Sequence, residues 1–140
     1  MCLSKISEKK IAEEDIVCYK IVHKFTDKHY RTVFQGMKVF LNTEYVDTTP
    51  KDDDSIGLTI SEINGGYYHT FKDKNKALKY SQYFGAAACV LKGIIPKGSE
   101  YYEGVYISIY QGNLPAYASK KIKYIEEVDP YNYKSLMYES

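Results

Sequence analysis

The sequence predicts an α+β domain in which a twisted, mainly antiparallel sheet of about six to eight strands carries one main helix. Three observations lead to this prediction. Short runs of β-branched and aromatic residues recur along the chain, several of these runs alternate apolar and polar residues, and one segment, 74–84, has helical spacing. A chain of 140 residues is close to the usual size of one domain, so we expect 1–140 to share a single core.

The first half of the chain is predicted to be extended. Ile16 to His23 is β-branched and partly alternating, and the acidic residues before it and the turn-forming residues after it bound a strand. Tyr30 to Phe34 and Met37 to Tyr45 are expected to form a second extended pair. The segment 48–55 has the proline and aspartate content of an exposed loop. Residues 1–12 are expected to form an N-terminal arm.

The helix prediction rests on side-chain spacing and on the two ends of the segment. Asp73 is a residue type that caps helix N-termini, and Gly85 is one that ends helices. Apolar and small residues fall on one face, and lysines fall on the other. The residues of the apolar face are Ala77, Leu78, Ser81 and Phe84. We therefore expect a helix over 74–84 that packs on the sheet.

Three further strands are predicted in the second half of the chain. The run 86–95 is continuously apolar, which is typical of a strand buried on both faces. The runs 105–110 and 121–128 alternate, except that Glu126 falls on the apolar side of the last one. The tail 130–140 is more apolar than a free chain end normally is, so we expect it to dock on its own domain or on a neighbouring subunit in a homodimer.

Composition and charge exclude several classes of protein. A formal net charge of +1 argues against a protein whose affinity comes from neutralising many phosphates of nucleic acid. Arg31 is the only arginine, which argues against specific DNA binding because base reading favours the planar guanidinium fork. No apolar run approaches the about 20 residues of a membrane span. We expect no membrane contact and a cytoplasmic location, in a bacterial or host cell, with reduced thiols at the three cysteines.

Two segments are the best candidates for a binding site. Gly66 to Phe71 (GYYHTF) is followed about two dozen residues later by Ile94 to Gly104 (IIPKGSEYYEG), and together they hold enough tyrosines, carboxylates and turns to build one pocket wall. Tyr68 and Tyr102 offer rings on which a base could stack, and His69 could act as a general base. The alternative is that these residues are structural, since neighbouring tyrosines on a strand point to opposite faces.

The residues do not predict catalysis or metal binding. The histidines and cysteines lack the spacing of a zinc site, and the aspartates of 52–54 lack the partners of a calcium loop. Cys18 and Cys89 lie in predicted buried strands, where a thiolate is disfavoured. No serine has a nucleophile elbow, and no glycine loop precedes a helix. We therefore expect no catalytic residue, no metal and no cofactor.

The order of several motifs resembles two groups of proteins. These motifs are a first strand with Tyr19-Lys20, the GYYHTF strand before a helix, an Ile-Pro-Lys-Gly-Ser turn and a late Ala118-Ser119 strand. The order resembles the core of small ADP-ribosyltransferase-like domains. It is also similar to short uncharacterised phage and gut-bacterial proteins that have a Gly-aromatic-His strand before the same turn.

The transferase resemblance implies roles for particular residues. Lys20 stands where the family has a histidine or arginine that holds the nicotinamide ribose, and Tyr68 stands where it has the tyrosine on which nicotinamide stacks. Glu103 or Glu126 would be the catalytic glutamate, and the sequence does not choose between them. Because Lys20 lacks an imidazole or a planar fork, we do not expect turnover, but a pocket for a nucleotide-like ligand remains.

We therefore predict a small non-catalytic binding protein that captures a nucleotide-type ligand or a host protein. The phage resemblance implies that this target belongs to a bacterial defence system. One alternative is an ADP-ribosyltransferase-like enzyme acting on NAD, and another is a structural or accessory subunit. The predicted ligand-binding residues are Lys20, Arg31, Tyr68, His69, Tyr102, Glu103 and Glu126.

Overall fold

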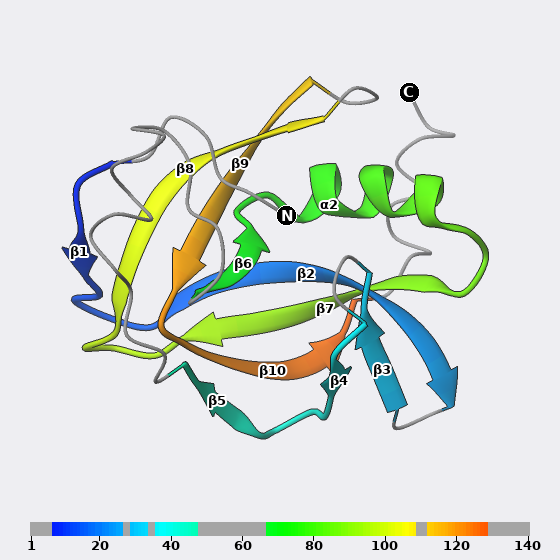
Figure 1. The fold of residues 1–140 in the computed structure, drawn as a ribbon, viewed down its shortest axis with the longest axis horizontal. Helices are drawn as coiled ribbons and strands as arrows, with labels where there is room; N and C mark the ends of the chain where they lie inside the picture. The colour runs from blue at the N-terminus through cyan, green and yellow to red at the C-terminus, as the bar shows by residue number, and fades with distance from the viewer. Residues whose placement is uncertain (1–6, 27–28, 34–35, 48–66, 109–111, 129–140) are drawn as a thin grey trace.

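Strand β2, Ile16–Thr26, is the longest strand and the centre of the sheet. It pairs antiparallel with three strands: β7 (Ala88–Ile95), β6 (Tyr68–Phe71) and β3 (His29–Thr32). The structure is a computed structural model and describes residues 7–26, 29–33, 36–47, 67–108 and 112–128 (Figure 1). The predicted loop 48–55 and the predicted docking tail 130–140 lie outside these residues.

The sheet contains ten described strands, and every described strand pair is antiparallel. Its order is β1-β8-β9-β6-β2-β7-β10-β5, while β3 pairs with β2 and β4 pairs with β3. The remaining strands are β1 (Lys10–Ile11), β4 (Lys38–Val39), β5 (Glu44–Val46), β8 (Glu100–Ser108), β9 (Gly112–Ser119) and β10 (Lys121–Glu127). The mainly antiparallel sheet is confirmed. Its strand number exceeds the expectation because strands as short as β1, β4 and β5 carry almost no alternation.

One α-helix lies within the described residues, and it begins where the sequence predicted. Helix α2, Lys74–Ser81, has Asp73 as its N-cap, whose side chain accepts a hydrogen bond of 2.9 Å from the Lys76 amide. The predicted helix continues as a 3-10 turn, η1 (Gln82–Phe84), and ends at Gly85, whose φ of 96° suits glycine. Leu78 and its apolar neighbours are buried, as expected.

Alternation along β2 separates two hydrophobic cores. Ile21 packs with Leu78 and other residues under α2, and we call this side of the sheet the helix face. Cys18 and Val22 point the other way and pack with Leu91 and its neighbours, and we call that side the far face. Figure 1 shows α2 alongside β2. Odd-numbered residues from Ile16 to Lys24 of β2 therefore point to the helix face, and even-numbered ones point to the far face.

A bulge in β10 decides which of two adjacent glutamates points to the far face. The pairing with β7 shifts between Tyr124 and Glu126, so Glu127 takes the position opposite Leu91. Glu127 accepts hydrogen bonds from the Lys24 ammonium at 2.9 Å and the Tyr30 hydroxyl at 3.1 Å.

Glu126 points to the helix face, and its side chain is 63% exposed. It contacts Lys92 at 3.9 Å. The expectation that Glu126 falls on the apolar side is wrong, because the bulge resets the alternation after Tyr124.

The bulge predicts that the two glutamates differ in their effect on stability. We expect Glu127→Gln to lower the free energy of unfolding by about 1–2 kcal/mol, because hydrogen bonds to a charged acceptor are the stronger ones. Glu126→Gln, the matched control, should change it by less than about 0.5 kcal/mol, since exposed ion pairs contribute little. Urea-induced unfolding at neutral pH measures both. Equal losses would contradict the assigned register.

Candidate functional site

The predicted binding residues lie on both faces of the sheet and do not form one site. Lys20, Tyr68 and Glu103 lie on the far face, because side chains alternate between the two faces along each strand. The other four lie on the helix face, and they are Arg31, His69, Tyr102 and Glu126. Even on the far face, β9 and β6 separate the strand of Glu103 from that of Lys20. Three strand spacings correspond to about 14 Å along the sheet.

Lys20 has its amine engaged by the backbone. The Lys20 Nζ donates a hydrogen bond of 2.7 Å to the carbonyl oxygen of His69 on β6. Burial lowers the pKa of Lys20 to about 8, and the neighbouring Cys18 acts in the opposite direction. The amine therefore links β2 to β6 inside the sheet.

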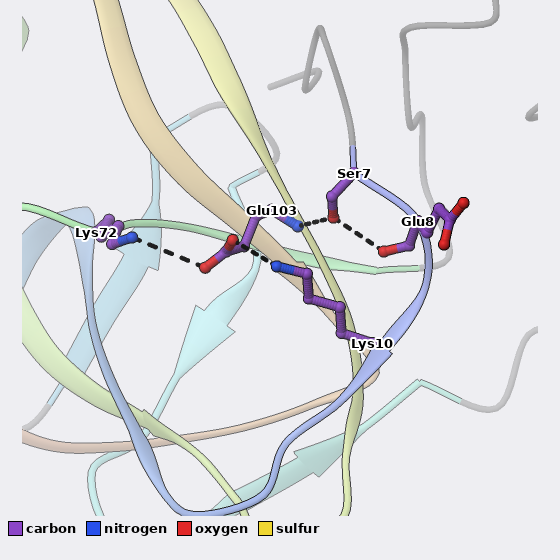
Figure 2. A network of polar contacts seen from close by, with 5 residues as sticks. All are labelled: Ser7, Glu8, Lys10, Lys72 and Glu103. Carbon is purple, nitrogen blue, oxygen red and sulfur yellow. Dashed lines mark hydrogen bonds and ion pairs between the residues drawn. The ribbon is translucent and has the colours of Figure 1, made fainter.

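Glu103 lies at the centre of a polar network that holds the first strand (Figure 2). Its carboxylate contacts the ammonium of Lys10 at 2.8 Å and that of Lys72 at 3.7 Å. The hydrogen bond from Lys10 is the main reason that the pKa of Glu103 is lowered. Ser7 donates its amide to the Glu103 carbonyl at 2.7 Å and accepts the Glu103 amide at 3.0 Å. Glu103 is therefore an ionised anchor between the N-terminal segment and β8.

The remaining residues of the two candidate segments are largely packed. His69 is 4% exposed, and Tyr102 stacks edge-on against Tyr67 with ring centroids 5.5 Å apart. Tyr68 is half-buried, and its ring is tilted against that of Tyr45 at 6.4 Å. The structure therefore gives Tyr102 and His69 positions in the core, in agreement with the structural alternative.

A pocket that sequence reasoning missed lies over the β2-β3-β4 end of the sheet. It has a volume of about 230 Å³. The lining residues are Phe25, His29, Tyr30, Arg31, Lys38, Val39 and Phe40. Tyr30 and Val39 are paired across β3 and β4, and their side chains pack in the far-face core. Strand alternation therefore leaves the backbone of this pair as the floor of the pocket.

Aromatic and cationic groups form the walls of this pocket. The Arg31 guanidinium lies over the ring of Phe25, 5.2 Å from its centroid, in a cation-π contact. The ring of His29 meets that of Phe40 edge-on at 5.8 Å, and it is hydrogen-bonded to the Thr26 hydroxyl at 2.9 Å. Phe25 is 63% exposed and Phe40 is 44% exposed. Both rings therefore present surface to a ligand.

Two positive charges are held directly opposite each other in this pocket. Arg31 on β3 is the cross-strand partner of Lys38 on β4. Like charges in this position repel and destabilise the strand pair. Among the described residues no carboxylate forms an ion pair with either of them or lines the pocket. A bound anion would relieve the repulsion, so the geometry suits a negatively charged ligand.

The sequence contains a partial signal for this pocket in two short alternating runs. Of the residues that line the pocket, only Arg31 is among the predicted ligand-binding residues. Alternation within the two short runs places His29 and Arg31 on one face of β3, and it places Lys38 of β4 and Phe40, the residue after β4, on one face of the second run. The cross-strand register is needed to bring these two pairs together, and a single strand pattern does not contain it.

The part of the chain that the structure describes offers little for covalent or metal chemistry. Within it, no three His, Cys, Asp or Glu side chains gather where they could hold a metal ion. Burial raises the pKa of both Cys18 and Cys89 to about 12, so neither is a thiolate at neutral pH. None of the described helices has the length and apolar character that crossing a membrane requires.

The pKa of Lys20 predicts a pH dependence of stability. The folded protein releases the Lys20 proton near pH 8, whereas the ordinary pKa of a lysine is 10.5. Between these values the unfolded chain binds more protons at this group, so its contribution to stability rises with pH. The free energy of unfolding of the wild type should therefore rise relative to that of Lys20→Met over this range in urea titrations. A constant difference, as expected for the exposed control Lys123→Met, would contradict the buried amine.

Comparisons with known proteins find no protein similar to this chain. No protein-family model, curated protein or solved structure matches the chain. The resemblance to ADP-ribosyltransferase-like domains and to short phage and gut-bacterial proteins therefore stays a prediction.

Proposed function

We propose that the protein binds a small anionic ligand with a planar ring, of the nucleotide type, in the β2-β3-β4 pocket, without turnover. One observation carries this proposal. Cationic side chains from β3 and β4 and two exposed aromatic rings converge on one pocket, and no described carboxylate lines it. Phosphate and base are the two groups that such a pair of features recognises.

The chemistry of each wall supports a separate part of the ligand. The guanidinium of Arg31 can bind a phosphate through two parallel hydrogen bonds, and the Lys38 ammonium adds a point charge. Phe25 and Phe40 offer ring faces, and stacking of a base on such a face contributes about 1–3 kcal/mol. The pocket therefore combines an affinity for charge with an affinity for a flat ring.

The pocket volume favours a mononucleotide over NAD. A volume of about 230 Å³ is below the about 300–1,000 Å³ of typical small-molecule sites. It is large enough to enclose one base or one phosphate-bearing sugar, so part of a mononucleotide, and most of the much larger NAD, would extend beyond it. The residues that the transferase resemblance assigns to an NAD site, such as Lys20 and Glu103, are spread along the far face and engaged elsewhere. Binding is therefore better supported than turnover of NAD.

The proposal predicts that charge and ring contacts can be separated by mutation. Isothermal titration calorimetry would compare a nucleoside monophosphate with its nucleoside. Arg31→Gln should weaken binding of the monophosphate by about 1.5–3 kcal/mol, the usual contribution of a charged hydrogen bond, and leave binding of the nucleoside unchanged. Phe40→Ala should weaken the binding of both ligands by about 1–3 kcal/mol, because it removes a stacking face.

Two control variants make this test specific. Lys123→Gln removes an exposed lysine and Ile107→Ala removes an exposed apolar side chain, and neither lies in the pocket. Both should leave the affinity unchanged. If no nucleoside monophosphate binds, the proposal fails. The exposed Phe25, Met37 and Phe40 would then be better explained as anchors for a protein partner.

A further inference from the structure

The charge distribution on the helix face extends beyond the pocket. Lys76 and Lys79 are exposed on α2 and lie three residues apart, so they are neighbours on the helix surface. No described carboxylate forms an ion pair with either. The helix therefore repeats what the pocket shows at Arg31 and Lys38, two adjacent positive charges without a described counterion.

The end of α2 leads directly to the pocket. The ring of His23 on β2 donates a hydrogen bond of 2.9 Å to the carbonyl oxygen of Phe84, the last residue of η1. His23 is the cross-strand partner of Arg31. Paired residues point to the same face of a sheet, so the His23 side chain that holds the helix end and the Arg31 side chain leave the same face of two adjacent strands, whose backbones are about 4.8 Å apart.

Acidic groups of this face lie near the other end of the helix. Asp73, the N-cap, and Glu126 both act on Tyr19, which lies four residues before His23 on β2. The Asp73 carboxylate accepts the Lys76 amide, and Glu126 contacts Lys92. The two acidic groups therefore lie near the start of α2, while Lys79 lies in its last turn, toward the pocket. The net charge of +1 is a sum over the whole chain, and it is compatible with a local cluster of cations at the pocket.

Aromatic rings occur along the same path. Tyr83 in η1 is 50% exposed, and its ring is tilted against that of Tyr80 at 6.1 Å. Phe25 and Phe40 follow at the pocket. Proteins that bind single-stranded nucleic acid without sequence preference alternate cations for the backbone with rings for the bases. A nucleic acid strand offers a phosphate for each cation and a base for each ring, whereas the acidic side chains of a peptide use only the cations.

We propose that the natural ligand is a single-stranded nucleic acid, whose terminal or flipped nucleotide occupies the pocket while its phosphates continue along Lys76 and Lys79. This inference rests on the proposed function and names the class of its ligand. Recognition is independent of base sequence, because stacking and phosphate contacts accept every base. A segment of about four nucleotides covers the pocket and the helix, whose eight residues span about 12 Å.

Fluorescence anisotropy with labelled oligothymidylate and oligouridylate of about four to eight nucleotides tests the inference, with a mononucleotide as competitor. We expect the oligonucleotides to bind at least tenfold more tightly than the mononucleotide. The double variant Lys76→Gln/Lys79→Gln should remove this gain and leave the mononucleotide affinity unchanged. It should also reduce the slope of log affinity against log salt by about 1.4, at about 0.7 for each lost phosphate contact.

The matched control is Lys121→Gln/Lys123→Gln, which removes two exposed lysines from β10. Lys123 pairs with a β7 residue that in turn pairs with Val17 of β2. Val17 lies about 20 Å along β2 from His23, so this control is far from the pocket. This control should leave both affinities unchanged. The inference is overturned if the mononucleotide binds but the oligonucleotides bind no more tightly. It is also overturned if the two double variants lose the same amount of oligonucleotide affinity. In either case the proposed mononucleotide site in the pocket is retained. If neither ligand binds, both the inference and the proposed function fail. Equal competition by polyglutamate would also overturn the inference, in favour of an acidic protein.

Discussion

The two-residue alternation of β2 from Ile16 to Lys24 is the constraint on which the rest of the structure depends. This strand pairs with β7, β6 and β3, so each of its side chains is committed to one of two environments. Ile21 joins the core under α2, while Cys18 and Val22 join the core on the far face. A slip by one residue would exchange these faces completely. The same parity places Lys20 and Lys24 on the far face and His23 on the helix face, which separates the polar groups of the sheet into two sets.

The two sets of polar groups have different roles because they have different access to water. On the far face, Lys20 bonds a backbone carbonyl and Lys24 bonds Glu127, so buried or half-buried charges have the partners that desolvation requires. On the helix face, Arg31 and Lys38 are exposed, adjacent and without a described counterion. Polar groups with partners stabilise the fold. Charges held together without a described counterion can accept an anionic ligand, and this is why we propose the β2-β3-β4 pocket as the binding site.

The sequence predicted those features that depend on local pattern. The helix has a cap at Asp73, an end at Gly85 and an apolar stripe that includes Leu78, all of which lie within a dozen residues of each other. The bulge at Glu126 could not be predicted in this way, because it is defined by pairing with β7, about 35 residues earlier in the chain. The proposed binding site shows the same division. Arg31 was recognisable as a phosphate-binding residue type, but its neighbours Phe25 and Lys38 are brought to it by strand register.

The location of ligand binding is the central claim, and a nuclear magnetic resonance titration tests it most directly. Amide chemical shifts of the isotope-labelled protein would be followed while a nucleoside monophosphate is added. The account predicts that the largest shift changes occur at Phe25, His29, Arg31, Lys38 and Phe40, which line the pocket. Changes confined to Tyr68, Tyr102 and Glu103 would contradict it and would return the site to the glycine-tyrosine segments.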